Sequence, residues 1–267
     1  MSYIIDLPKI CDRVNKLVLS VGDFIHNERK KVSPIKVEEK SSHNFVTYVD
    51  TTAEKKLIEG LIDILPQAGF IAEEQTNTKK GTKYNWIIDP LDGTTNYIHG
   101  LPPYAISIAL MEKEEIILGV IFEISLNECF YAWKGSKAYL NGNIISVTKT
   151  AKVNDSLIAT GFPYYDYAKL KPFMQSIEYF MQNSHGLRRL GSAATDLAYV
   201  ACGRFDAFYE YSLSAWDVAA GAIIVKQAGG KVSDFNGENN YLFGKEIIAT
   251  NQNIYSEFAS VIGKIMN

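Results

Sequence analysis

The sequence is poor in the residues that form covalent cross-links and transition-metal sites. Its 267 residues include only three cysteines, Cys11, Cys129 and Cys202, with no Cys-x-x-Cys spacing. An odd number of widely separated cysteines argues against a disulfide framework and against a zinc site. We therefore expect three small core residues in a protein of the reducing cytoplasm.

Long apolar runs and excess basic charge are also missing. No stretch approaches the roughly 18 apolar residues that a membrane-spanning helix needs, and the first residues lack the basic and apolar regions of a signal peptide. The formal net charge is −3 and the pI about 5.9. This charge balance gives no reason to expect nucleic acid as a partner. We therefore expect the protein to bind neither nucleic acid nor a membrane.

What remains is an ordinary globular composition, with 47% hydrophobic and 21% charged residues. The length suits one large domain or two small ones. Apolar residues recur every three or four positions from Leu7 to Ile25 and from Ala53 to Leu65, which predicts two amphipathic helices. We expect Asp50 or a following threonine to be the N-cap of the second helix. Between the helices, residues 29–44 are polar and turn-rich and predict a mobile loop.

The middle of the chain changes to strand-like patterns, which predict a largely antiparallel sheet. Helices and strands then alternate from residue 151 onward. No internal repeat or flexible linker separates the two parts, so we expect one catalytic unit, 1–267, with two intimate halves at about 1–150 and 151–267. The expected strands of the first half lie at 70–72, 86–88, 105–111, 116–122 and 129–133, with a hairpin near 141–142. Those of the second lie at 158–160, 188–190, 207–209 and 247–249, with helices at 167–182, 192–203, 215–227 and 254–265.

The segment from Trp86 to His99 carries the strongest chemical signal. Asp89 and Asp92 follow an apolar run and are separated by Pro90, which stiffens the turn. The Gly93-Thr94-Thr95 turn that follows is typical of a helix N-terminus, where free backbone N–H groups bind phosphate. Carboxylate oxygens bind hard cations. Although two aspartates alone could be turn formers, the dense grouping predicts metal-assisted chemistry on a phosphate.

Other acids gain meaning from their recurrence. Four strand-like runs end in acid, and strand ends that gather at one edge are where sites form. Each acid also has a simpler interpretation: Glu73 as the start of a charged loop, Asp50 as a helix cap, and Asp217 as a capping acid before a run of small residues. The four runs end at Glu73, Asp89, Glu210 and Asp217.

Two motifs resemble the signatures of the inositol monophosphatase family. The first is Trp86-Ile-Ile-Asp89-Pro-Leu-Asp92-Gly-Thr-Thr95-Asn-Tyr97, and the second runs from Trp216-Asp217 to Gly229-Gly230. The resemblance covers nearly the whole chain. It implies an α/β fold, the αβαβα five-layer sandwich of the inositol monophosphatase and fructose-1,6-bisphosphatase type. It also implies a magnesium-dependent, lithium-sensitive phosphatase that is commonly a homodimer.

The resemblance further implies a metal set. Glu73, Asp89 and the Leu91 carbonyl would hold one Mg²⁺, and Asp89, Asp92 and Asp217 a second. Glu73 would also face a loosely held third ion that keeps mostly water ligands. Such a set agrees with the preference of Mg²⁺ for a few carboxylates completed by water and substrate oxygens. Li⁺ is expected to inhibit.

The family mechanism maps onto this sequence by position. Phosphate would bind the N–H groups of Gly93, Thr94 and Thr95, and a metal-activated water would attack the phosphorus in line. Thr94 with Asp50, or Glu73, would orient and deprotonate that water. The residues expected to contact the substrate alcohol are Asp92, Gly191, Ser192, Ala193 and Glu210.

The expected reaction is hydrolysis of myo-inositol monophosphate or a similar small sugar or polyol phosphate. The segment from Gly161 to Asp166 resembles bacterial and archaeal members more than animal inositol enzymes, and it should border the alcohol side of the site. Fructose 1,6-bisphosphate and the 2′-phosphate of NADP are therefore alternative substrates. A non-enzymatic regulatory protein on the same fold is the alternative from another class. We also expect residues 33–44 to form a mobile lid near the third metal.

Overall fold

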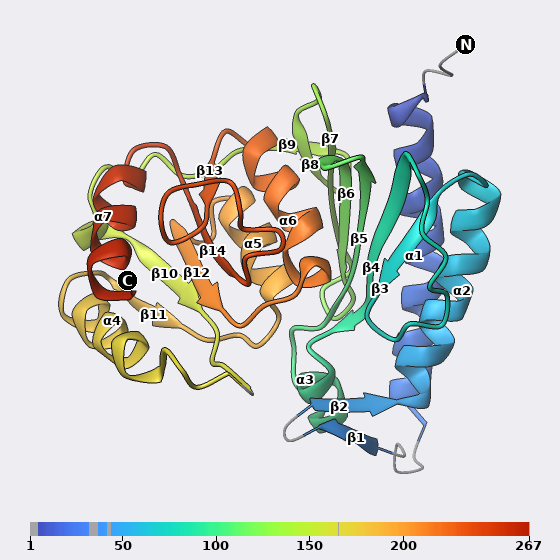
Figure 1. Cartoon of the computed structure of the whole chain (residues 1–267), viewed down its shortest axis with the longest axis horizontal. Helices are drawn as coiled ribbons and strands as arrows, with labels where there is room; N and C mark the ends of the chain where they lie inside the picture. Colours follow the sequence, from blue (N-terminus) through green and yellow to red (C-terminus); the bar gives the residue numbers. More distant parts are fainter. Residues whose placement is uncertain (1–4, 32–36, 42–43, 165, 267) are drawn as a thin grey trace.

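Helical layers and sheets alternate through the molecule, as Figure 1 shows. The computed structural model describes residues 5–31, 37–41, 44–164 and 166–266. From one side to the other, the layers are α1 with α2, a seven-stranded sheet, α5 with α6, a five-stranded sheet, and α4 with α7. This arrangement confirms the predicted αβαβα sandwich. The layer helices are α1 (Leu7–Arg29), α2 (Tyr48–Ile64), α4 (Leu170–Gln182), α5 (Ala193–Ala201), α6 (Ala215–Gln227) and α7 (Tyr255–Met266).

The seven-stranded sheet has the order β3-β4-β5-β6-β7-β8-β9, and only its β3–β4 pair is parallel. The largely antiparallel character predicted from the sequence is thus confirmed. A short helix, α3 (Thr94–His99), follows β4 directly. The strands are β3 (Gly69–Ala72), β4 (Tyr84–Asp92), β5 (Ala105–Glu112), β6 (Glu115–Glu123), β7 (Glu128–Trp133), β8 (Ala138–Leu140) and β9 (Asn143–Ile145).

The five-stranded sheet has the order β11-β10-β12-β14-β13 and mixes parallel with antiparallel pairs. Strand β13 was not predicted, because three residues after a glycine pair carry too short a pattern to recognise. A 3₁₀ turn at Val153–Asp155 precedes this sheet. The strands are β10 (Leu157–Thr160), β11 (Gly186–Arg188), β12 (Ala207–Tyr211), β13 (Lys231–Ser233) and β14 (Glu246–Thr250).

Three hydrophobic clusters fill the spaces between the layers. One lies between the α1–α2 pair and the first sheet, around Trp86, and another lies between the second sheet and the α4–α7 pair, around Phe258. The central cluster surrounds α5 and α6, whose alanine-rich faces allow close packing against both sheets. There Gly119 of β6 has room only for hydrogen, because a Cβ would come within 2.6 Å of the Ala220 carbonyl oxygen. The helices of the second half thus pack directly on the sheet of the first. The division into halves at about 150 stays a prediction.

The segment after α1 is a correction to the predicted loop. Strands β1 (Val37–Ser41) and β2 (Asn44–Thr47) pair antiparallel, with Val37 opposite Thr47. The charged pattern concealed this hairpin, because two strands can satisfy each other's backbone hydrogen bonds without an alternating apolar face. The predicted lid at 33–44 includes residues 33–36 and 42–43, which lie outside the described residues.

Smaller predictions about the acids are corrected in part. The N-cap of α2 is Thr47, and Asp50 lies at the third helical position, where its carboxylate accepts the Thr47 N–H at 2.8 Å. Asp217 lies in the first turn of α6 and completes a capping box with Ser214, so its interpretation as a capping acid is confirmed, whereas the strand-like run expected before it is not. Glu210 lies inside β12, one residue before the end of the strand.

Within the described ranges, no helix combines the length and the apolar character needed to cross a membrane.

Candidate active site

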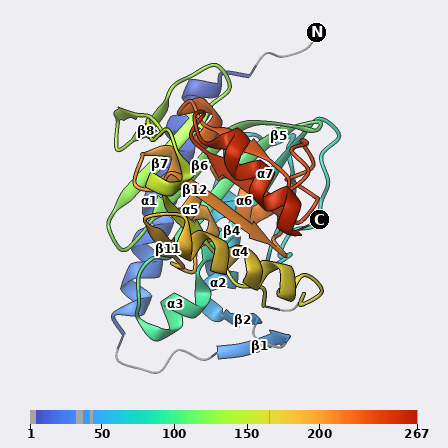
Figure 2. The same ribbon diagram turned by 90° about the vertical axis from the view of Figure 1, so that its left-hand side faces the viewer.

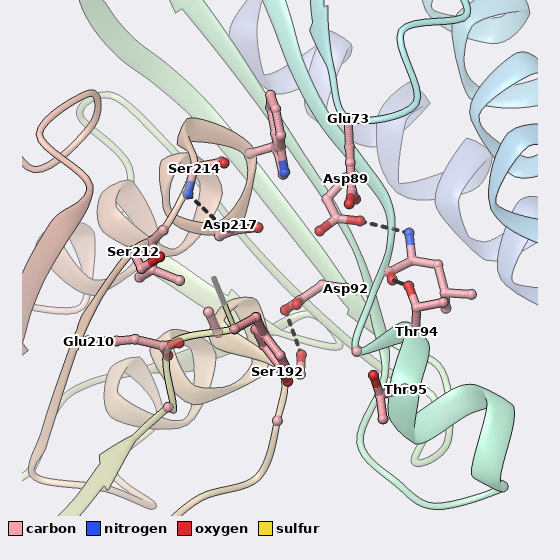
Figure 3. Close-up of a pocket in the computed structure, with 18 of the residues that line it drawn as sticks. Glu73, Asp89, Asp92, Thr94, Thr95, Ser192, Glu210, Ser212, Ser214 and Asp217 are labelled. Carbon is pink, nitrogen blue, oxygen red and sulfur yellow. Dashed lines mark hydrogen bonds between the residues drawn. The ribbon is translucent and has the colours of Figure 1, made fainter. Parts of the chain in front are cut away.

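A cleft of ≈ 340 Å³ opens where the first sheet, α3, the start of α5 and the start of α6 meet (Figure 3). Its size suits a small polar molecule. The cleft brings together every predicted site residue except Asp50, which lies one hydrogen bond behind Thr94. The predicted residues that line it are Glu73, Asp89, Leu91, Asp92, Gly93, Thr94, Thr95, Gly191, Ser192, Ala193, Glu210 and Asp217.

Strands β3 and β4 place two of the acids side by side. Ala72 pairs with Ile88 in the parallel ladder, and the Glu73 N–H then donates to the Ile88 carbonyl at 3.2 Å. Glu73 is therefore level with Asp89, as Figure 3 shows. The pairing of β4 with β5 shifts register between Asp89 and Asp92, around Pro90, which has no N–H to donate. This irregularity turns the strand end into the cleft.

Hydrogen bonds of two serines fix the start of helix α6 beside Asp89. Ser107, which pairs with Asp89 across β4 and β5, donates its hydroxyl to the Trp216 carbonyl at 3.0 Å. The Ser214 N–H donates to the Asp217 carboxylate at 2.6 Å. The first bond fixes the start of the helix against the sheet, and the second fixes the orientation of the Asp217 side chain. Asp217 therefore faces Asp89 across the cleft (Figure 3).

One carboxylate oxygen from each of Asp89, Asp92 and Asp217 lies within 4.8 Å of the others. Burial, and then the surrounding carboxylates, raise the pKa of Asp89 well above its ordinary value. Burial raises the pKa of Asp92 to about 6 and, with the charge of Asp92, that of Asp217 to about 7. Three acids enclosed this closely repel one another unless a cation lies between them. The oxygen-only donor set fits Mg²⁺.

Thr94 joins two other predicted residues at the start of α3. Its hydroxyl oxygen lies 3.0 Å from the Asp50 carboxylate and 3.0 Å from the Leu91 carbonyl. Asp50 is 2% exposed, and its burial raises its pKa. Its second oxygen accepts from the Thr47 backbone and hydroxyl. The result is a rigid carboxylate–hydroxyl pair at the edge of the cleft.

Asp92 connects the end of β4 to the start of α5 across the cleft. Its carboxylate accepts the Ser192 hydroxyl and the Ala194 N–H, both at 2.7 Å. The backbone approaches closely here, because a Cβ on Gly93, whose φ is +90°, would lie 3.3 Å from the Gly191 carbonyl oxygen. The strand end of the first sheet thus docks on the first turn of α5.

Glu210 lies on the far wall of the cleft with another buried acid behind it. A Cβ on Gly161 would come within 2.1 Å of its carboxylate, so the glycine provides the space that Glu210 occupies. Asp196 of α5 is 1% exposed. Burial, followed by the charges of Glu210 and Asp92, raises the pKa of Asp196 well above its ordinary value, and Arg189 opposes this shift.

Three residues that line the cleft were not named individually from the sequence, namely Phe162, Tyr164 and Arg189. Phe162 and Tyr164 belong to the segment at 161–166, which was expected to border the site and does so. Arg189 was missed altogether. Nothing in the pattern around Arg189 separated it from its neighbour Arg188, because a predicted strand end does not show which side chain turns inward.

A layered α/β fold with a cleft lined by converging carboxylates is the arrangement found in metal-dependent phosphatases. The comparisons agree. Residues 9–266 match the model of the Inositol monophosphatase family, so the chain belongs to that family. The protein is therefore an enzyme of the phosphoric monoester hydrolase class.

Among its relatives is a protein of Neisseria meningitidis named putative Nus factor SuhB, 37% identical over 248 residues, or 92% of this chain and 95% of that protein. An inositol-1-monophosphatase of Mesorhizobium japonicum is 35% identical over 92% of this chain and 93% of its own length. Among solved structures, the extragenic suppressor protein SuhB of Bartonella henselae superposes with a TM-score of 0.90 at 35% identity, covering 95% of this chain and 98% of that one. An IMPase of Thermotoga maritima gives a TM-score of 0.86 at 37% identity, covering 95% and 96%.

Proposed function

We propose that the protein is a Mg²⁺-dependent phosphomonoesterase that hydrolyses myo-inositol monophosphate or a similar small sugar or polyol phosphate to the free alcohol and phosphate. The observation that carries the proposal is the convergence of the Asp89, Asp92 and Asp217 carboxylates within 4.8 Å beside a helix start. Family membership supports the reaction class. The size and polarity of the cleft support a small substrate.

The metal ligands of the proposal are the oxygens already described. Glu73, Asp89 and the Leu91 carbonyl would hold one Mg²⁺, and Asp89, Asp92 and Asp217 another, with a third loosely held beside Glu73. When bound, Mg²⁺ lowers the pKa of water and neutralises charge on the phosphoryl group. Asp89, which is 2% exposed and contributes to both sets, is the central ligand.

Protein groups bind the phosphate and accept the proton. The N–H groups of Gly93, Thr94 and Thr95 lie at the start of α3 and would hold the phosphate oxygens. The Thr94 hydroxyl, bonded to Asp50, would orient the attacking water and pass its proton to that carboxylate. The raised pKa of Asp50 makes it a stronger base than an ordinary aspartate. Glu73 is the alternative proton acceptor.

The alcohol would lie toward α5 and β12. Glu210 would accept hydrogen bonds from its hydroxyls, and Asp92 would reach another hydroxyl. The backbone of Gly191, Ser192 and Ala193 lies along the same wall. The Ser192 hydroxyl is already directed at Asp92, so the backbone of this stretch is what it offers to substrate.

Phosphate release from inositol 1-phosphate tests the proposal. We expect turnover with Mg²⁺, none with EDTA, and inhibition by Li⁺. Fructose 1,6-bisphosphate and NADP are the alternative substrates, and a panel of kcat/KM values ranks them. A purified, folded protein that releases phosphate from no phosphomonoester would refute the proposal.

The regulatory alternative is favoured by relatives that are named Nus factors. It predicts a partner-binding function that survives loss of the metal ligands, whereas the enzyme needs them. An Asp89→Asn variant therefore separates the two.

We further propose that the protein is a cytoplasmic homodimer without nucleic-acid or membrane partners. Light scattering tests the homodimer, and cell fractionation tests the location.

A further inference from the structure

Arg189 is a cation in the cleft with unused hydrogen-bonding capacity. Its guanidinium lies 5.3 Å from the Phe162 ring centroid and 5.7 Å from that of Tyr164, and it donates to the Tyr164 hydroxyl. Its Nε is buried without a hydrogen-bond partner. None of the ion pairs formed by the described side chains includes Arg189. The guanidinium is thus held in place by aromatic rings, not by a carboxylate.

The position of Arg189 is on the alcohol side of the cleft. It lies two residues before Gly191, and a Cβ on Gly191 would come within 2.8 Å of the Nη1 atom of Arg189. It lines the cleft together with Ser192 at the start of α5 and Glu210 of β12. Its charge also opposes the rise that burial causes in the pKa of Glu210. The cation therefore faces the region where the leaving alcohol would lie.

We propose that Arg189 and Tyr164 form a subsite for a second anionic group, a phosphate or a carboxylate, carried by the alcohol part of the substrate. The inference rests on the proposed phosphatase function and narrows its substrate class. A guanidinium binds such anions through two parallel N–H bonds. Because Tyr164 accepts from Arg189, its own hydroxyl proton is free to donate to the same anion.

Two further observations support the subsite. Burial raises the pKa of Tyr164, so its hydroxyl keeps the proton that it would donate. Phe162 is 47% exposed although it is a large apolar residue, and it packs edge-on against the buried Phe173. Its ring thus forms a fixed wall beside the guanidinium. A competing explanation is that Arg189 only balances the charges of Glu210 and Asp196. In that case its loss would lower activity equally on all substrates.

The test compares three substrates at saturating Mg²⁺: p-nitrophenyl phosphate, inositol 1-phosphate and fructose 1,6-bisphosphate. Only the last carries a second anion on its alcohol. We expect the wild-type protein to prefer it, and Arg189→Gln to lower kcat/KM for it by about 10- to 100-fold. The same variant should lower kcat/KM for p-nitrophenyl phosphate by a clearly smaller factor than for fructose 1,6-bisphosphate, and Arg189→Lys should lose an intermediate part of kcat/KM for fructose 1,6-bisphosphate. Arg188→Gln is the matched control, because the Arg188 side chain is exposed and donates to the carbonyl of the neighbouring Leu187.

Calorimetry in EDTA, where no turnover is expected, measures binding at the subsite without hydrolysis. The ratio of dissociation constants for inositol 1-phosphate and fructose 1,6-bisphosphate should exceed one for the wild type and fall toward one in Arg189→Gln. Equal losses on all three substrates would overturn the inference, as would a wild-type protein without preference. If no substrate is hydrolysed, the proposed function fails, while the calorimetric ratio still decides whether the subsite exists.

Discussion

Asp92 and Ser192 lie 100 residues apart in the sequence and are joined by a hydrogen bond of 2.7 Å. Asp92 ends the second strand of the first sheet, and Ser192 is the N-cap of α5. This contact makes the cleft a joint between the two parts of the molecule. A carboxylate proposed as a metal ligand thus also fixes the wall on which the alcohol would lie.

Replacing Asp89 by asparagine should separate activity from folding. We expect phosphate release to fall by about 100-fold or more, since a shared ligand of two ions is lost. The melting temperature in EDTA should stay the same or rise, because the change removes one of several repelling carboxylates. Activity assays and thermal unfolding measure both effects. Activity within tenfold of the wild type would contradict the proposed ligand role.

Thr94→Val should reduce activity far more than Thr95→Val. The Thr94 hydroxyl contacts Asp50, and removing a positioned proton-transfer group costs about 10²- to 10⁴-fold in kcat. Both variants keep the backbone N–H groups proposed to bind phosphate. Rate measurements on the two proteins at saturating substrate test the prediction, and similar losses in both would assign Thr94 no special role.

Gly161→Ala should act on the substrate through Glu210. The added methyl would overlap the Glu210 carboxylate, which must then move. We expect KM for inositol 1-phosphate to rise by about tenfold, the effect of losing a hydrogen bond to a charged group. KM for p-nitrophenyl phosphate, which has no hydroxyl to bind, should change little. Glu210→Gln is the companion variant, and the role of Glu210 fails if both variants raise KM equally for the two substrates.

Without metal, the protein should lose stability as the pH rises. Asp92 and Asp217 have pKa values of about 6 and about 7 in the folded protein, above the ordinary value of 3.8. The folded state therefore binds more protons than the unfolded state between about pH 4 and pH 7, and this contribution to stability disappears as the pH passes through 6 and 7. Urea unfolding in EDTA at pH 5 and pH 8 measures the fall.

Magnesium reverses this dependence, because it binds the deprotonated carboxylates. We expect Mg²⁺ to raise the free energy of unfolding more at pH 8 than at pH 5. Asp217→Asn supplies the control, since it removes one of the titrating groups and should flatten the fall in EDTA. An unfolding free energy that rises from pH 5 to pH 8 in EDTA would contradict the prediction.

The sequence was most informative where chemistry and local geometry coincide. The Asp89-Pro90-Leu91-Asp92 segment predicted a bend with two acids, and the structure has a register shift at that place. The layered fold was also predictable, because α1 and the strands from β3 to β7 have clear periodicities. Partners far apart along the chain could be assigned only through the family resemblance.

The elements that were missed were missed for different physical reasons. Strand β13 is too short to display a period, and the charged and polar residues of the β1–β2 hairpin show no alternating apolar face. Capping was misassigned at α2 because Thr47 and Asp50 are both good capping residues, and only the three-dimensional path shows which one begins the helix. The inward turn of Arg189 depends on Phe162 and Tyr164, which come from a distant loop.

Asp50 and Asp217 each accept the N–H of the residue that caps their helix, Thr47 in α2 and Ser214 in α6. These two acids therefore hold the ends of two helices while they face the reacting groups. Any ligand that fixes either carboxylate also tightens a helix end, so occupancy of the cleft and local unfolding of α2 and α6 are thermodynamically linked. Hydrogen exchange in the first turns of these helices should consequently report on binding at a distance from the substrate itself.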